Sequence, residues 1–269
     1  MNINWYPGHM AKTRRQLEGD IAPADALIEL LDARIPASSR NPDIEALKGE
    51  KPCLTVLGRA DAADPVVTEA WKRAIPNAVA VNAVSQAAVK VILPALKTLL
   101  AERITFFADK GQAGRAMRVL VLGIPNVGKS TLINTLLRRR AAKAEDRPGV
   151  TRSHQWFPME RGFLLMDTPG LLWPKFEDPV IGQHLAFTGA IRDEILDTES
   201  LAALLCARLN NLYPGALTRR YGVSDGLEAM ARKRGFLLPG GVTDTERMAL
   251  TLLDEFRAGK LGRLTLEKP

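Results

Sequence analysis

A glycine-rich loop near the middle of the 269-residue chain has the composition of a phosphate-binding site. Its glycines, Gly123 and Gly128, let the backbone wrap closely around an anion so that several N–H groups point at it. Lys129 can then reach the outer phosphates of a nucleotide, and the Ser130 hydroxyl can bind Mg²⁺. The helix predicted from Thr131 offers its positive end to the same anion. The other loop residues expected to contact the phosphates are Ile124, Pro125, Asn126 and Val127.

The segment DTPG at 167–170 ends a second apolar run and points to the same chemistry. Asp167, at the end of a predicted strand, suits a water-mediated contact with Mg²⁺, and Gly170 can donate its backbone N–H to a γ-phosphate. Between the two motifs, Thr151 closes the turn-prone run RPGVT and could bind Mg²⁺ when a triphosphate is present. Together these features predict a nucleoside triphosphatase with movable switch segments.

Apolar strand segments alternate with helical patterns around these motifs, which is typical of an α/β fold. The expected strands lie in segments 26–34, 53–61, 78–84, 118–123 and 163–170, and the expected helices span 68–75, 87–104 and 129–139. This alternation predicts a mostly parallel sheet with helices on both faces. From about residue 178 onward the apolar spacing is helical throughout. We therefore expect a nucleotide-binding domain over 1–177 and a smaller all-α domain over 178–269.

The residues suited to binding a base come before the phosphate loop. A guanine site needs an acceptor for the ring N–H and the exocyclic amine, and nothing after Gly170 supplies one at a strand end. Asp61 ends one early strand segment, and Asn82 and Ala83 end the next. Ligands bind at such strand ends in open α/β sheets. The first half of the chain is thus expected to hold the base and the second half the phosphates, which is a circularly permuted order.

These motifs, in this order, resemble one family. WYPGHMAKTRR at the start, LDARIP, GRAD, GIPNVGKST, RPGVT, DTPG and the closing GKLGRLTLE are similar to ribosome biogenesis GTPase A, the YlqF-type circularly permuted GTPases, over nearly the whole chain. The resemblance implies GTP and Mg²⁺ as ligands and GTP hydrolysis linked to late assembly of the large ribosomal subunit. It also implies a helical domain that contacts ribosomal RNA, and a low intrinsic rate stimulated by the ribosomal particle.

The family pattern NKAD is GRAD here, at 58–61. Asp61 is kept, whereas Gly58 has no side chain to bond the base or brace the phosphate loop. Arg59 can still lay its aliphatic stem on the purine face. Losing one such hydrogen bond costs about 1 kcal/mol, whereas adenine would leave the Asp61 carboxylate without a partner. We expect weaker GTP binding with the preference for guanine retained.

The group that orients the attacking water is not where many GTPases place it, since Leu171 follows the DTPG glycine. Among three histidines, the resemblance makes His9 the candidate, acting with Lys129 and Thr151. His154 is a weaker candidate, and His184 lies in an apolar helical run typical of a structural residue. An isolated histidine is more often structural, so that alternative stays open for His9.

Two further positions have competing interpretations. Asn126 either helps hold a potassium ion that offsets charge between the phosphates, as in related GTPases, or stabilises its own turn. Asp32 and Arg34 form either a local switch or structural link near the nucleotide site, or a salt bridge at a strand end.

A net charge of +7 favours a polyanionic partner. No apolar run approaches the roughly 18 residues of a membrane span, and the start has no signal-peptide core. We expect a cytoplasmic monomer whose partner is the large ribosomal subunit, or its precursor, and its RNA. Two alternatives are a nucleotide-dependent RNA-binding module with little or no hydrolysis and a small-molecule kinase, although DTPG and Asp61 fit a GTPase better than a kinase.

Overall fold

The computed structural model describes residues 10–138, 155–160, 162–173 and 176–269. Within them, six strands form one sheet in the order β3-β2-β1-β4-β6-β5. The strands are β1 (Ala26–Asp32), β2 (Cys53–Gly58), β3 (Ala78–Ala80), β4 (Met117–Leu122), β5 (Phe157–Met159) and β6 (Phe163–Asp167). Every neighbouring pair is parallel except β5 with β6. The predicted mostly parallel sheet is therefore confirmed, with one antiparallel strand at its edge.

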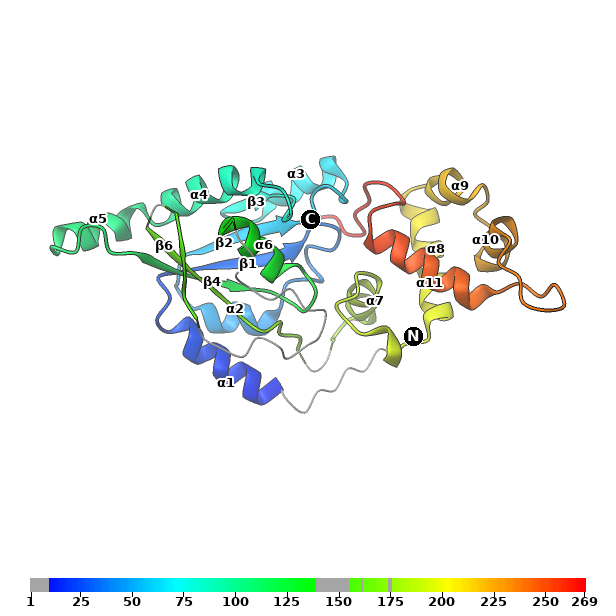
Figure 1. Ribbon diagram of the computed structural model, residues 1–269, viewed down its shortest axis with the longest axis horizontal. Coiled ribbons are helices and arrows are strands. Elements are labelled where there is room, and N and C mark those ends of the chain that lie inside the picture. The colour runs from blue at the N-terminus through cyan, green and yellow to red at the C-terminus, as the bar shows by residue number, and fades with distance from the viewer. Residues whose placement is uncertain (1–9, 139–154, 161, 174–175) are drawn as a thin grey trace.

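Helices cover both faces of the sheet, as predicted (Figure 1). Alternate residues of β1 point to opposite faces, so Ile28 packs with α4 (Ala87–Leu99) and α6 (Lys129–Leu136). Leu27 instead packs with α1 (Met10–Ile21) and α2 (Pro42–Lys48). On that second face, Trp71 of α3 (Pro65–Ala74) packs against Leu31 and Leu57. Such two-sided burial explains why all seven residues of β1 are buried.

The single helix expected over 87–104 is wrong, because the structure has two helices there. α4 ends at Leu99, and α5 (Ala101–Asp109) begins after the fully buried Leu100. α4 buries a regular apolar stripe, whereas α5 has no buried residue. The change follows from packing, since α5 extends past the end of the sheet and has no layer to cover (Figure 1).

The chain after residue 178 is helical and lies beyond one end of the sheet (Figure 1). Its elements are α7 (Pro179–Phe187), the 3₁₀ helix η1 (Asp193–Ile195), α8 (Thr198–Leu212), α9 (Ala216–Tyr221), α10 (Leu227–Arg234) and α11 (Thr245–Arg257). Leu205 of α8 and Leu252 of α11 are fully buried between these helices. After α11 the chain runs back to the sheet, where the Leu266 N–H donates to the carbonyl of Arg34 at 2.8 Å. Among the described residues, no helix combines the length and apolarity needed to cross a membrane.

Candidate functional site: a nucleotide cleft at the carboxyl edge of the sheet

The phosphate loop connects the end of β4 to the start of α6, as the glycine spacing predicts. Gly123 has φ of 153°, and a Cβ atom there would lie 2.6 Å from the Leu30 carbonyl oxygen. Gly128 has φ of 101° and immediately precedes the helix. Both positions therefore favour glycine, because both have a positive φ. At Gly123 the close packing on β1 also leaves no room for a Cβ atom.

Lys129 lies inside this loop. Its ammonium donates to the carbonyls of Ile124 at 2.9 Å and Gly123 at 3.2 Å. Burial lowers its pKa to about 8, and the neighbouring charge of Asp167 only partly opposes this shift. The positive charge is thus held at the centre of the cradle by weak carbonyl partners, which an incoming phosphate can replace.

Ser130 and Asp167 form the pair expected to bind Mg²⁺. The Ser130 hydroxyl donates to Oδ2 of Asp167 at 2.6 Å. The other carboxylate oxygen, Oδ1, is buried and accepts no hydrogen bond from the residues that the structure describes. Burial also raises the pKa of Asp167, against the lowering effect of the Ser130 hydrogen bond. A hydroxyl beside an unsatisfied carboxylate oxygen is a ligand set that suits a hard divalent cation.

Gly170 lies against the phosphate loop. A Cβ there would stand 2.6 Å from both the N and Cα atoms of Pro125 and 3.0 Å from Nζ of Lys129. The next residue is held on both sides of its backbone. The Leu171 N–H donates to the Gly123 carbonyl at 3.4 Å, and its carbonyl accepts from Nδ2 of the buried Asn41 at 2.8 Å. The DTPG segment and the phosphate loop are thus brought together.

Sequence reasoning missed Asn41. Asn-Pro-Asp at 41–43 is a recognisable helix start, and Oδ1 of Asn41 does accept from the Asp43 N–H at 2.9 Å. The second bond of this side chain joins residues 130 positions apart in sequence, which no local pattern reveals.

The early segments lie at the same edge of the sheet as the phosphate loop, because β2, β3 and β4 all run in one direction. Asp61 is exposed in the loop after β2. That loop is joined to the end of β3 by the Ala60 N–H, which donates to Val81 at 3.2 Å. Asn82 forms a turn by accepting the Val84 N–H at 3.0 Å. Ala83 between them is buried.

Arg59 and the Asp32–Arg34 pair both connect this edge to the helical region. Nη1 of Arg59 donates to the Arg257 carbonyl at 2.9 Å, so its aliphatic stem is the part available to a purine. Arg34 forms a buried ion pair with Asp32 at 2.7 Å, and its Nη1 donates to the Phe256 carbonyl at 3.0 Å. The salt bridge expected at the strand end is thus present, whereas the switch role of Asp32 and Arg34 stays a prediction.

The remaining predicted residues have other positions. Nδ2 of Asn126 donates to the Gly189 carbonyl at 2.8 Å, so the amide contacts the segment after α7. Because a cation would use the amide oxygen instead, the potassium interpretation stays a prediction. His184 is buried with Nδ1 2.8 Å from Oε1 of Glu267, which fits a structural residue. His9, Thr151 and His154 lie outside the described residues.

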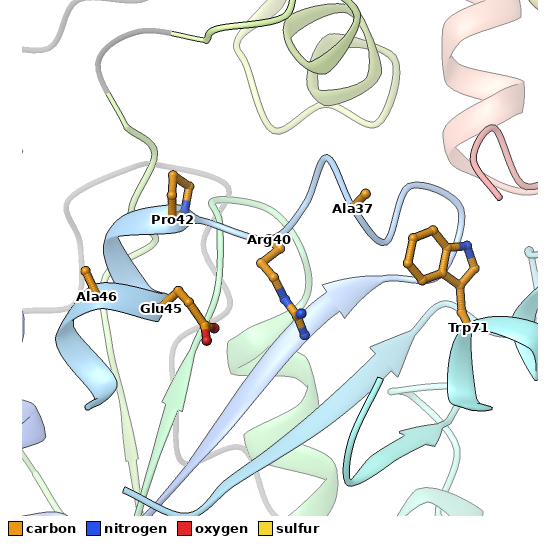
Figure 2. Close-up of a pocket in the computed structure, with 6 residues that line it drawn as sticks. All are labelled: Ala37, Arg40, Pro42, Glu45, Ala46 and Trp71. Carbon is orange, nitrogen blue, oxygen red and sulfur yellow. The ribbon is translucent and has the colours of Figure 1, made fainter. Parts of the chain in front are cut away.

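A pocket of about 580 Å³ is lined by residues on both sides of Asn41 in the sequence, and Arg40 extends into it from the segment before α2 (Figure 2). It is lined by Ala37, Arg40, Pro42, Glu45, Ala46 and Trp71, none of which is a predicted nucleotide contact. Arg40 approaches the buried Glu29 carboxylate at 3.3 Å, and burial raises the pKa of Glu29.

The chain is similar to known GTPases over nearly its whole length. A family model described as 50S ribosome-binding GTPase matches residues 118–211. A ribosome biogenesis GTPase A from Bacillus cereus is 44% identical over 280 residues, covering 100% of this chain and 95% of that protein. A GDP-bound YlqF structure has a TM-score of 0.69 at 27% identity, covering 95% of this chain and 99% of that one. A GNP-bound YlqF from T. maritima has a TM-score of 0.67 at 27% identity, covering 96% and 98%. The family model begins at β4, which agrees with a permuted order of base half first and phosphate half second.

Proposed function

This chain belongs to the ribosome biogenesis GTPase A family, and from that premise we propose that it is a GTP-driven switch in late assembly of the large ribosomal subunit. In this proposal it binds the subunit, or its precursor, in the GTP state and leaves after hydrolysis. The observation that carries it is the cluster of Lys129, the Ser130–Asp167 pair and Gly170 around one phosphate loop. Asp61 stands on the same edge of the sheet, where a base would lie.

Recognition of GTP follows from these contacts. The Asp61 carboxylate accepts the N1–H and the exocyclic amine of guanine, while Asn82 and Ala83 border the base. The backbone from Ile124 to Thr131 cradles the phosphates. Lys129 exchanges two carbonyl partners for phosphate oxygens, a stronger charge-assisted bond.

Hydrolysis uses the residues around the terminal phosphate. Ser130, Asp167 and Thr151 would hold Mg²⁺, which when bound offsets the negative charge of the phosphates. Gly170 donates its N–H to the γ-phosphate, and its contact with the phosphate loop makes the segment that carries it sensitive to the nucleotide. His9 orients the attacking water, because Leu171 buries its side chain and has no polar atom to offer. Asn126 is the proposed ligand of a potassium ion.

The helical region, residues 178–269, is the proposed contact for ribosomal RNA. Its arginines are not equivalent. Arg220 and Arg234 both pair with Glu255, at 2.5 Å and 3.4 Å, and are therefore committed to the fold. Arg219 and Lys233 are exposed and make no ion pair with any residue that the structure describes. Within α9 and α10 these are the basic side chains without an ion pair to a described residue, and we propose them for phosphate contacts.

GTP turnover with and without large ribosomal subunits, in potassium buffer, tests the proposal. We expect the particle to stimulate turnover, and a chain that binds subunits without any turnover would support the non-hydrolysing RNA-binding alternative instead. The charge reversal Arg219→Glu with Lys233→Glu should weaken subunit binding and lower its salt slope by about 2. Lys90→Glu with Lys97→Glu, on exposed positions of α4, is the matched control with the same charge change. An equal loss in both pairs would contradict an RNA contact on the helical region.

The base assignment has its own test. Asp61→Asn replaces an acceptor by an amide that can donate, so it should weaken GDP and strengthen xanthosine diphosphate, which carries a carbonyl where guanine has an amine. Titration calorimetry of GTP against ATP on the unaltered chain should show a guanine preference; equal affinities would remove the assignment. A monomer in the cytoplasm is the setting that we propose for this activity.

A further inference from the structure

The loop that carries Asp61 is held in place from the far end of the chain. We call residues 59–64 the base loop. Arg263 donates from Nε to the Ala63 carbonyl at 3.0 Å and from Nη2 to the Ala60 carbonyl at 2.9 Å. One guanidinium therefore bridges two carbonyls on either side of Asp61. The fixed fork of an arginine spans the two carbonyls with two separate nitrogens, whereas a lysine ammonium donates from a single nitrogen atom.

The residues next to Arg263 continue the contact. The Leu264 N–H donates to the Ala62 carbonyl at 2.9 Å, and the Asp64 N–H donates to the Thr265 hydroxyl at 3.0 Å. Leu264 and Thr265 are themselves buried. Residues 263–265 thus bond to the backbone of the base loop at several positions, once through the Leu264 N–H and otherwise through side chains.

Two backbone bonds, from the Ala60 N–H to Val81 and from the Ala62 N–H to Arg59, also hold the base loop. Gly58 has no side chain with which to bond a neighbouring loop. Arg59 has φ of 54°, a left-handed conformation that non-glycine residues adopt only when their surroundings impose it. Its guanidinium donates to the carbonyl of Arg257, the first residue of what we call the C-terminal segment, residues 257–269. Residues 257–265 thus bond to the base loop at Arg59, Ala60, Ala62, Ala63 and Asp64.

We infer that Arg263 is a positioning residue for guanine recognition, which holds the Asp61 carboxylate where it can accept both guanine donors. This inference rests on the proposed recognition of guanine by Asp61. It assigns to the C-terminal segment the bracing that a side chain at position 58 does not provide. It also makes base affinity depend on residues more than 200 positions away in the sequence.

The test compares the dissociation constants of GDP, inosine diphosphate and ADP for the full chain and for Arg263→Ala and Arg263→Lys. Inosine lacks the exocyclic amine, so the ratio of the inosine diphosphate and GDP constants measures the second hydrogen bond to Asp61. We expect GDP to weaken about tenfold and this ratio to fall in both variants, while ADP is unchanged. Lys268→Ala, an exposed position in the same segment, is the control and should leave the ratio at the wild-type value.

A general loss of folding is separated from a loss of positioning by two measurements. Thermal unfolding without nucleotide reports the stability of each variant, and Arg263→Lys keeps the charge and one bond. If the ratio stays at its wild-type value in both variants, the inference is overturned, whatever happens to stability. If Asp61→Ala also leaves the ratio unchanged, the proposed guanine recognition itself is wrong. If Asp61→Ala lowers the ratio and the Arg263 variants leave it at the wild-type value, only the positioning role of Arg263 fails.

The bracing by the C-terminal segment is tested in a second background. Gly58→Asn restores the residue of the NKAD pattern, and its Cβ would lie 3.0 Å from the flexible Cδ1 atom of Leu30, which can move to make room. With asparagine present, Arg263→Ala should cost GDP affinity less than it does beside Gly58. An equal cost in the two backgrounds would overturn the claim that the segment substitutes for a side chain at position 58.

Discussion

Replacing Arg34 by methionine should strongly lower the free energy of unfolding of the protein. Arg34 is 1% exposed and binds both oxygens of Asp32, at 2.9 Å and 2.7 Å. It also donates to the carbonyls of Phe256 and Arg257, so it joins β1 to the end of α11. Methionine fills a similar volume but removes the guanidinium charge and its two bonds, which leaves the buried Asp32 carboxylate with the backbone N–H of residue 34 and no charged partner at that position.

The size of the loss follows from that uncompensated carboxylate. Breaking a buried pair by removing one partner costs about 3–5 kcal/mol, a large part of the roughly 5–15 kcal/mol that stabilises a typical domain. Burial alone would raise the pKa of Asp32, but the charge and hydrogen bonds of Arg34 outweigh burial and leave it lowered. In the unaltered protein, this pair therefore adds stability above the unfolded pKa of about 3.9, and that contribution is lost as pH falls through the lower folded value.

Urea unfolding followed by tryptophan fluorescence, at pH 7 and at pH 4, measures the effect. We expect Arg34→Met to cost about 3–5 kcal/mol at pH 7 and less at pH 4, where Asp32 can take up a proton in the variant. The double change Asp32→Asn with Arg34→Met buries no charge and should recover much of the loss. A cost below about 1 kcal/mol at pH 7, or no recovery in the double variant, would refute the assignment of the energy to this ion pair.

Three other predictions concern single side chains. The hydrogen bond from Arg220 holds the pKa of Glu255 at about 2, so the stabilising effect of the Glu255 carboxylate is complete above about pH 4.5 and is lost as pH falls toward 2. Glu255→Gln should therefore flatten the fall of the melting temperature at acid pH, and an unchanged fall would contradict this. Because burial lowers the pKa of Lys129 to about 8, GDP binding near pH 8 should take up protons. The calorimetric binding enthalpy should then change with the ionisation enthalpy of the buffer, and identical enthalpies in all buffers would count against this. Asn41→Ser keeps a cap for α2 but loses the amide donor to the Leu171 carbonyl, so GTP turnover should fall about tenfold with GDP affinity retained. Full turnover would show that this bond does not position the DTPG segment.

Much of the site could be predicted because it is local in sequence. The phosphate loop, with Lys129 and Ser130, follows from the spacing of glycines between a strand and a helix, and the structure places it there. Asp167 ends its strand as expected and meets the hydroxyl of Ser130. Parallel strands bring their carboxyl ends to one edge, so the order of the motifs also predicts which loops can share a ligand.

The phosphate-binding motifs and the permuted order of the two halves could be predicted from the amino-acid sequence, because short motifs with local backbone geometry carry both. What holds those motifs in position emerges only when the chain folds. Arg34 reaches the Phe256 carbonyl, Arg263 reaches the base loop, and Asn41 reaches Leu171, in each case across more than 100 residues. Such bonds depend on how separate layers pack, because backbone carbonyls are present at every residue and give no sequence signal of which one a distant donor will find.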